Sequence, residues 1–214
     1  MSSIKLKHSG GNSVSLNPPT SAPTSSEVAF KLPTSDGSAG QVLMTDGSGN
    51  LSWKTPSKII QVVQAYKTDT FTASITNQQE SGNVTGLTPS ITPTNASNKI
   101  LVMWDIMTGN SVSSRIGLKL YKDDSVLTGS LADTAGSSSR VTAYSSTMQN
   151  DRMWGLSGKY LDTAGSTSSI TYSVRLRIGN TASNDVYVNR PGTLYDNSGG
   201  MVAASSLVLM EIAA

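Results

Sequence analysis

The chain has 214 residues, enough for one ordinary domain with an appendage, and its 14% charged residues lie well below the roughly 25% typical of soluble domains. The formal net charge of +2, with no basic run interleaved with aromatic residues, argues against a nucleic-acid partner. No stretch approaches about 18 consecutive apolar residues, so we expect no membrane insertion. The absence of cysteine excludes disulfides, thiolate metal sites and a cysteine nucleophile.

Serine, threonine and glycine supply the polar surface that lysine and glutamate supply in most domains. Long helices favour alanine, glutamate, lysine and leucine, whereas this composition is common in all-β extracellular and virion proteins. The N-terminal stretch has no apolar core of the kind found in secretory signals, so we expect none there. The composition therefore predicts an all-β protein.

Residues 1–57 contain short strand-like pieces and almost no aromatic side chains. Alternation of apolar and polar residues predicts strands at Ile4–Lys7, Ser13–Leu16 and Val28–Leu32. Prolines between the second and third pieces hold the chain extended and exclude a helix. Because such isolated strands cannot bury their apolar faces within one chain, we predict that residues 1–57 form an arm that gains its order from partners.

A β-hairpin is predicted at the end of the arm. Two Asp-Gly pairs, Asp36-Gly37 and Asp46-Gly47, bracket the apolar residues 41–45, and Leu51 and Trp53 then alternate with a serine. A two-stranded hairpin is marginal in water, so this one must lean on another structure.

From Lys58 onward the chain reads as a series of strands separated by turn signals. The strands are predicted at residues 59–66, 71–76, 99–107, 115–121, 125–131, 140–148, 152–161, 170–179, 185–189 and 201–212. This spacing, without helical periodicity, predicts that residues 58–214 form an antiparallel, jelly-roll-like β-sandwich. The fold class is therefore all-β, with an extended β-rich N-terminal arm and hairpin followed by the sandwich.

Two strands of the sandwich carry particularly clear patterns. In residues 172–178, Tyr172, Val174, Leu176 and Ile178 alternate with polar residues and are predicted to face the core. The last strand is apolar on both faces, which indicates a central or interface position and an oligomer. Trp104 lies within an apolar strand and is predicted to be a core residue.

A short sequence occurs twice: LADTAGS at residues 131–137 and LDTAGS at 161–166. We interpret the two copies as similar strand connections in which Gly136 and Gly165 supply positive φ. The alternative is a pair of exposed loops at one end of the sandwich that contact a ligand.

Residues suited to catalysis are scarce. The only histidine, His8, lies in the arm, far from any core, and the Asp46 loop lacks the glycine and glutamate of a calcium-binding EF-hand. Paired carboxylates of a hydrolase would have to come from aspartates that lie mostly in turns: Asp105, Asp123, Asp124, Asp151, Asp162, Asp185 and Asp196. We therefore predict no enzyme activity, no catalytic residue, no metal site and no cofactor.

Four residues are candidates for surface recognition. Trp154 and Tyr160 flank glycines that would let a partner or a sugar ring approach, although ordinary core aromatics on a glycine-softened strand are the favoured interpretation. Arg190 and Tyr195 lie in the longest late loop, where a Pro-Gly turn would present them.

The arm sequence KLKHSGGNSVSLNPPTSAPTSSEVAFKLP, followed by DGSAGQVLMTDGSGNLSW, resembles the N-terminal region of tail-fibre-like structural proteins of marine phages, especially those that infect cyanobacteria. Residues 4–53 carry the resemblance, and GQVLMTDGSGNLSW is its most specific part. The ending SSLVLMEI at residues 205–212 is similar to the last strand of small trimeric jelly-roll domains in such fibres.

The resemblance implies a homotrimer in the virion, assembled in the host cytoplasm, whose arm binds other virion proteins of the tail or capsid. The apolar arm residues assigned to attachment are Ile4, Leu6, Val14, Leu16, Phe30, Leu32, Val42, Met44, Leu51 and Trp53. The leading hypothesis is a trimeric tail fibre whose sandwich attaches to a host-surface polysaccharide or protein. The alternatives are a capsid decoration protein or head fibre and, third, an envelope-degrading hydrolase.

Overall fold

The computed structural model describes residues 4–17, 19–25, 27–54, 56, 58–76, 78–147, 149–179, 183–197 and 199–214. The chain divides into two compact units, Met1–Ser57 and Lys58–Ala214. Every strand pair is antiparallel, and the described residues contain no helix apart from one 3-10 turn. None of them forms a helix that could span a membrane. The predicted all-β fold class is confirmed.

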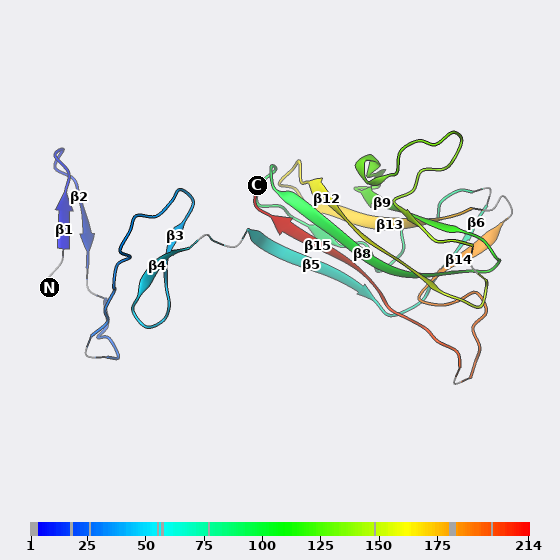
Figure 1. Ribbon diagram of the computed structural model, residues 1–214, viewed down its shortest axis with the longest axis horizontal. Helices are drawn as coiled ribbons and strands as arrows, with labels where there is room; N and C mark the ends of the chain where they lie inside the picture. The colour runs from blue at the N-terminus through cyan, green and yellow to red at the C-terminus, as the bar shows by residue number, and fades with distance from the viewer. Residues whose placement is uncertain are drawn as a thin grey trace. The chain divides into compact units, whose positions relative to one another are not determined.

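The arm begins with a two-stranded ribbon of β1 (Ile4–Lys7) and β2 (Ser13–Leu16) (Figure 1). The turn between them contains Gly11 at a φ of 89°, a conformation that favours glycine. The register places four apolar side chains on one face of the ribbon: Ile4, Leu6, Val14 and Leu16. Lysines and serines occupy the other face. The ribbon is therefore amphipathic, and its four apolar side chains are exposed.

The predicted hairpin is confirmed as β3 (Val42–Thr45) paired with β4 (Leu51–Lys54). The Asp46 carboxylate organises its loop by accepting hydrogen bonds from the backbone amides of Ser48 and Asn50 and from the Asn50 side chain, at 2.8, 3.1 and 2.6 Å. The Asn50 side-chain bond is the main reason that the pKa of Asp46 is lowered.

Two details of the predicted arm are wrong. Asp36-Gly37 does not form the turn that precedes β3; that turn lies at residues 38–41, and Gly37 instead lies against Trp53, where a Cβ would stand 2.5 Å from the indole. The predicted strand at residues 28–32 is reduced to a single bridge between Lys31 and Asn50, in which the Lys31 amide donates to the Gly49 carbonyl and the Lys31 carbonyl accepts from the Leu51 amide.

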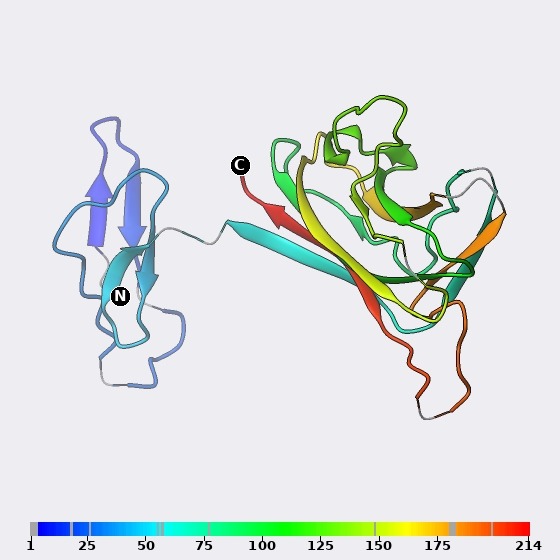
Figure 2. The ribbon, with the colours of Figure 1, turned by 45° about the vertical axis from the view of Figure 1, so that its right-hand side comes forward.

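The larger sheet of the sandwich has β15 (Ser205–Ile212) between β5 (Ile59–Lys67) and β8 (Lys99–Asn110). The other side of β8 pairs with β12 (Trp154–Thr163), while β14 (Asn184–Val188) pairs with the far end of β8 and with β6 (Phe71–Ile75). The central position predicted for the last strand is confirmed (Figures 1 and 2).

The smaller sheet is built on β9 (Ile116–Lys122) and β13 (Ile170–Ile178). Three short strands extend it: β10 (Ser125–Val126) and β11 (Ala143–Tyr144), which pair with β9, and β7 (Ser90–Ile91), which pairs with β13. The apolar side chains between the two sheets form one core. The alternation predicted for β13 is confirmed, because Tyr172, Val174, Leu176 and Ile178 are completely buried.

Trp104 is buried as predicted, and a glycine makes room for it. Gly158 of β12 is directly opposite Trp104 of β8, and a Cβ on Gly158 would stand 2.5 Å from the indole. This close approach explains the glycine as a packing residue. The positive φ values predicted for Gly136 and Gly165 are confirmed, at 55° and 73°.

Several strands are shorter than predicted. The segment 125–131 contains only β10 and a 3-10 turn, η1 (Thr128–Ser130), and the segment 140–148 contains only β11, with residue 148 outside the described residues. β15 begins at Ser205 rather than at residue 201. Serine, threonine and glycine in these segments satisfy backbone groups by local hydrogen bonds, which competes with strand pairing.

Candidate functional site

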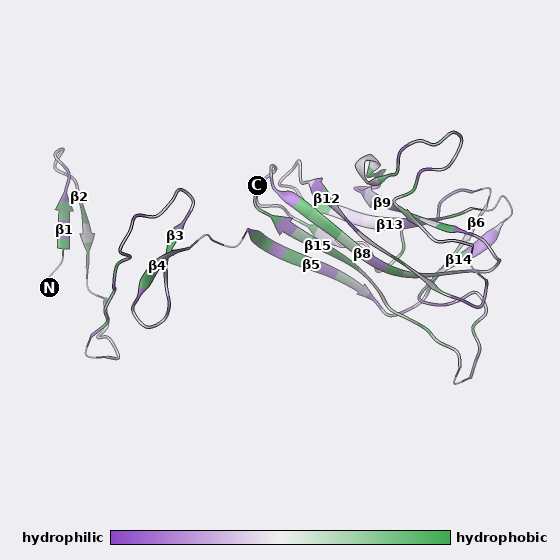
Figure 3. Ribbon diagram, in the orientation of Figure 1, coloured by the Kyte–Doolittle hydropathy of each residue, from purple (hydrophilic) through white to green (hydrophobic). Residues whose placement is uncertain are grey.

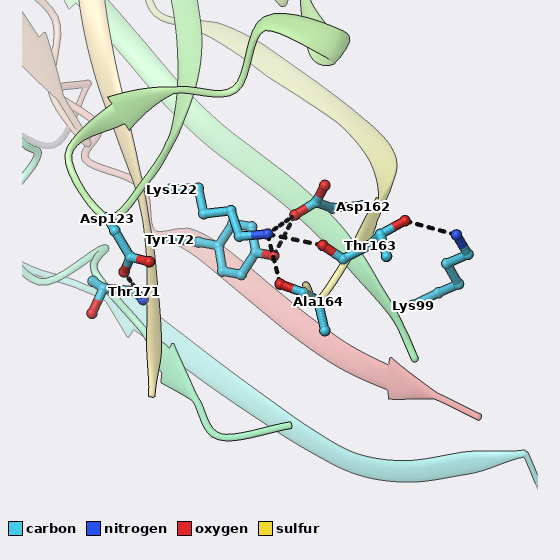
Figure 4. Close-up of polar contacts among 8 residues, drawn as sticks. All are labelled: Lys99, Lys122, Asp123, Asp162, Thr163, Ala164, Thr171 and Tyr172. Carbon is cyan, nitrogen blue, oxygen red and sulfur yellow. Dashed lines mark hydrogen bonds and ion pairs between the residues drawn. The ribbon is translucent and has the colours of Figure 1, made fainter. Parts of the chain in front are cut away.

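Lys122, at the end of β9, joins the two sheets at one end of the sandwich (Figure 4). Its ammonium donates hydrogen bonds to Asp162 Oδ2 at 2.8 Å and to the carbonyl oxygens of Thr163 and Ala164 at 2.8 and 2.9 Å. The Tyr172 hydroxyl donates to the same Asp162 oxygen at 2.7 Å. The side chains of Lys122 and Asp162 are only 24% and 14% exposed, so this ion pair is largely shielded from water.

The polar groups of this cluster are satisfied by one another. The three protons of the Lys122 ammonium match its three acceptors, and burial together with the bond to Asp162 raises the pKa of Tyr172. The Tyr172 hydroxyl is therefore a hydrogen-bond donor at ordinary pH. We interpret the cluster as a clamp between β9 and β12 rather than as a reactive centre.

Removal of the Asp162 carboxylate is expected to weaken the fold. Asp162→Ala leaves a shielded ammonium and a buried hydroxyl without their acceptor, which should lower the free energy of unfolding by about 2–3 kcal/mol. Asp151→Ala is the control, because its 3.9 Å pair with Arg152 is exposed, and should change it by less than about 0.5 kcal/mol. Urea unfolding at neutral pH measures both. Equal midpoints for the two variants would contradict the clamp.

A second cluster surrounds Glu211, which is completely buried in β15. Its Oε1 accepts hydrogen bonds from the Thr94 amide and hydroxyl at 2.7 and 2.8 Å and from Asn98 Nδ2 at 2.6 Å. Its Oε2 accepts one from Gln61 Nε2 of β5 at 2.5 Å. Burial raises the pKa of Glu211, but these hydrogen bonds outweigh it and lower the pKa to about 2. Glu211 is thus an ionised carboxylate that ties β15 to β5 and to the loop before β8.

The outer face of the smaller sheet presents four basic residues, three from β9 and β13 and one directly before β9: Lys119, Arg175, Arg177 and Arg115. Lys119 is 2.5 Å from Glu80, and Arg175 is 2.8 Å from Asp124 and lies over the Tyr121 ring. Among the residues that the structure describes, neither Arg115 nor Arg177 has a carboxylate within ion-pair distance. At one end of this basic array, therefore, the two arginines form no ion pair within the described residues.

A depression of about 670 Å³ lies at that end of the array. Its lining combines Arg115 and Arg177 with an amide, serine hydroxyls, glycines and a few apolar side chains: Gln78, Arg115, Gly117, Ala135, Ser137, Ser138, Ser139, Val141, Tyr144, Arg177, Ile178 and Gly179. Gly117 allows the loop that forms one wall to approach, because a Cβ there would stand 2.7 Å from Val141. The lining contains no acidic residue, and the Tyr144 ring is 67% exposed beside it.

A smaller depression of about 440 Å³ lies beside the turn at Asp123 and Asp124. Both residues have positive φ, 47° and 58°, as a tight two-residue connection between β9 and β10 requires. The Asp123 carboxylate accepts the Thr171 amide hydrogen bond at 2.8 Å, and Asp124 accepts from Arg175 and Asn83. These two aspartates, considered above for a hydrolase, are thus engaged in turn and ion-pair contacts.

The four candidate recognition residues are only partly brought together. Trp154 pairs with Thr108 at the far end of β8, and Arg190 starts the loop whose backbone lies against Gly109. Tyr195 is exposed in that same loop, which extends away from the sandwich (Figure 2). Tyr160 is six residues along β12 from Trp154, roughly 20 Å away, and packs against the core. Arg190 is itself engaged, 4.7 Å above the Tyr187 ring.

The apolar arm residues remain largely uncovered within their own unit. Ile4, Leu6, Val14 and Leu16 share one face of the ribbon, and Phe30 and Leu32 are isolated side chains on an extended segment. Val42 and Met44 face one side of the hairpin, whereas Leu51 and Trp53 face the other. Leu51 is the only one of the ten that is half-buried; the others are exposed.

Sequence reasoning missed the buried Glu211, the partly buried Lys122 and the basic depression. Glu211 and Lys122 each stand among apolar residues of a strand, and a charge in such a position is the signal for a buried, partnered group. The alternation of Arg175 and Arg177 was visible, but the pairing with Arg115 depends on strand register.

No protein-family model matches the chain, and no curated protein matches it. Among solved structures, the chain is similar to one described as "Structure of infectious bursal disease virus Gx strain", with 15% sequence identity and a TM-score of 0.35. The match covers 77% of this chain and 39% of that chain. At that TM-score the likeness does not establish a shared fold.

Proposed function

We propose that the protein is a non-enzymatic, homotrimeric virion fibre whose arm attaches to the particle and whose sandwich contacts the host surface. The observation that carries this proposal is the exposure of the arm's apolar residues. Ile4, Leu6, Val14, Leu16, Phe30 and Leu32 are 65–74% exposed, a state that favours burial against partners. The resemblance of residues 4–53 to phage tail-fibre arms supports the same function.

The proposed homotrimer is supported by the outer face of the larger sheet. Register aligns a row of four apolar residues across four strands: Val62 of β5, Met210 of β15, Leu101 of β8 and Leu161 of β12. The next row contributes Val208 and Met103. We call these six residues the apolar face; Figure 3 shows the apolar character of β5, β8 and β15.

The apolar face points away from the core. Its residues alternate with the fully buried Leu207, Leu209, Ile100 and Val102, so they lie on the opposite side of each strand. At the flanks of the row, Val62 is 55% and Leu161 is 52% exposed. Contiguous apolar surface across four strands is unusual on a monomer, and further copies of this chain are the occupant we propose.

The attachment role of the arm can be tested with variants of the ribbon face. Leu6→Ser/Leu16→Ser removes two side chains from the apolar side of the ribbon and should reduce co-sedimentation of the protein with particles that lack their own copy at least tenfold. Lys5→Ser/Lys7→Ser, on the polar side of the same ribbon, is the matched control and should retain most of the co-sedimentation of the wild-type protein. Equal co-sedimentation of both variants would contradict attachment through this face.

Particles that lack the protein also distinguish a fibre from a decoration protein, a head fibre or a hydrolase. A fibre predicts that particles without the protein fail to adsorb to cells. A decoration protein or head fibre predicts normal adsorption with loss of particle stability, and a hydrolase predicts release of product from host polysaccharide.

A further inference from the structure

We propose that the depression on the outer face of the smaller sheet binds an acidic saccharide, with Arg115 and Arg177 holding a carboxylate or sulfate group of the sugar. The proposal deepens the host-contact role and rests on the proposed function for its biological setting. The binding itself is argued from the charges, shape and surface chemistry of the depression.

The basic residues at the depression favour an anionic ligand. Lys119 and Arg175, the other basic residues of this face, are matched by Glu80 and Asp124, whereas Arg115 and Arg177 have no such partner among the described residues. The charge of Arg177 helps to lower the pKa of the nearby Glu80. The two oxygens of the Glu80 carboxylate, however, accept hydrogen bonds from Lys119 and Tyr121. Planar guanidinium groups bind carboxylates and sulfates through two parallel hydrogen bonds.

The position of the two arginines suits one shared anion. Arg177 lies opposite Gly117 and Arg115 lies opposite Gly179, so the two basic residues are diagonal neighbours on adjacent strands. Both positions opposite the arginines are glycine, and the Val141 side chain occupies the space beside Gly117. Diagonal neighbours across two strands are roughly 7–8 Å apart, a span that a single oxyanion group can bridge with two long side chains.

The remaining lining suits a sugar. Ser137, Ser138 and Ser139 offer hydroxyls along one wall, and Gln78 offers an amide that already accepts an Arg177 hydrogen bond at 3.3 Å. The Tyr144 ring is exposed at the depression and can lie against the C–H face of a pyranose. The volume of about 670 Å³ falls within the roughly 300–1,000 Å³ of small-ligand sites.

Backbone features hold this lining in place. Gln78 has a φ of 60°, which is uncommon for a residue other than glycine and is held by the turn that Gln79 makes with Thr76. The serine wall belongs to a loop closed at its neck by the hydrogen bonds of Ala132 with Val141 and Arg140. The site is therefore formed before any ligand is present.

Titration calorimetry on the full chain tests the proposal. The probes are tetrasaccharides of galacturonate, of a sulfated galactan and of neutral galactan, together with sodium sulfate. We expect both acidic tetrasaccharides to bind at least tenfold more tightly than the neutral one. Arg115→Gln and Arg177→Gln should each weaken that binding about tenfold, and Tyr144→Ala should weaken it severalfold. Arg152→Gln changes an exposed arginine in the loop before β12; it is the control and should stay within twofold.

Every outcome decides the question. Equal binding of neutral and acidic sugars, or no loss with Arg115→Gln, overturns the proposal; so does binding of sodium sulfate as tight as that of the tetrasaccharides, which would mean an adventitious ion only. Arg115 is exposed, so its variant should fold, and circular dichroism checks this. Sugar binding without incorporation into particles would refute the proposed function alone. Incorporation and adsorption with no sugar binding would refute this site alone.

Discussion

Glu211→Ala is expected to lower the free energy of unfolding by about 3–5 kcal/mol, because it removes a buried carboxylate that accepts hydrogen bonds from Thr94, the buried Asn98 and the half-buried Gln61. The loss should be large because these donors connect β15 to two other segments, β5 and the loop before β8. Glu211→Gln keeps the volume and one acceptor oxygen, and should cost about 2 kcal/mol. Urea unfolding at pH 7 measures both, with the exposed arm residue Glu27→Ala as a control that should change nothing measurable.

The pH dependence of the same comparison provides an independent check. The folded pKa of Glu211, about 2, lies below the ordinary value of 4.5, so its contribution to stability is complete above about pH 4.5 and is lost as the pH falls toward 2. The shift corresponds to about 3 kcal/mol. The difference in unfolding free energy between the wild-type protein and Glu211→Gln should therefore shrink from pH 5 to pH 2. A difference that stays constant over this range would contradict an ionised Glu211.

Leu101→Glu is expected to convert the proposed homotrimer into monomers. Leu101 lies in the central row of the apolar face, and a carboxylate there would be buried without a partner at the interface between copies. Light scattering at micromolar concentration should give three times the 22.4 kDa chain mass for the wild-type protein and one chain mass for the variant.

The control for this experiment is Ser113→Glu, which adds the same charge to an exposed loop and should remain trimeric. If the Leu101→Glu variant is still trimeric, the interface between copies does not include this part of the apolar face. A monomeric wild-type protein would refute the homotrimer. The apolar face would then have to bind a different partner, such as the particle.

Strand periodicity was sufficient to predict the sandwich because burial on one side of a sheet imposes an alternation that the sequence displays. The inward-facing residues of β13 and the central position of β15 follow directly from this pattern. Strand periodicity predicted too much strand where local hydrogen bonds of serine, threonine and glycine compete with strand pairing, as in the segment after β10. The turn prediction was wrong at Gly37, because this glycine makes room for the Trp53 ring instead of forming a turn.

The candidate sites were less predictable than the fold. Arg115 and Arg177 are 62 residues apart in sequence and meet only because β9 and β13 pair in one particular register. A shift of one residue would have turned one of them to the other side of the sheet. The Lys122 clamp depends in the same way on the crossing of β9 and β12 between two sheets, which no local pattern specifies.

The central position of β15 has a consequence for synthesis. β15 follows every other strand of the sandwich in sequence, yet it lies between β5, the first of them, and β8, and its residues Val208 and Met210 form part of the apolar face. The larger sheet therefore cannot close between β5 and β8 until β15 has been synthesised, and the apolar face is incomplete before then. A truncation within β15 is expected to remove both the closure of this sheet and part of the apolar face.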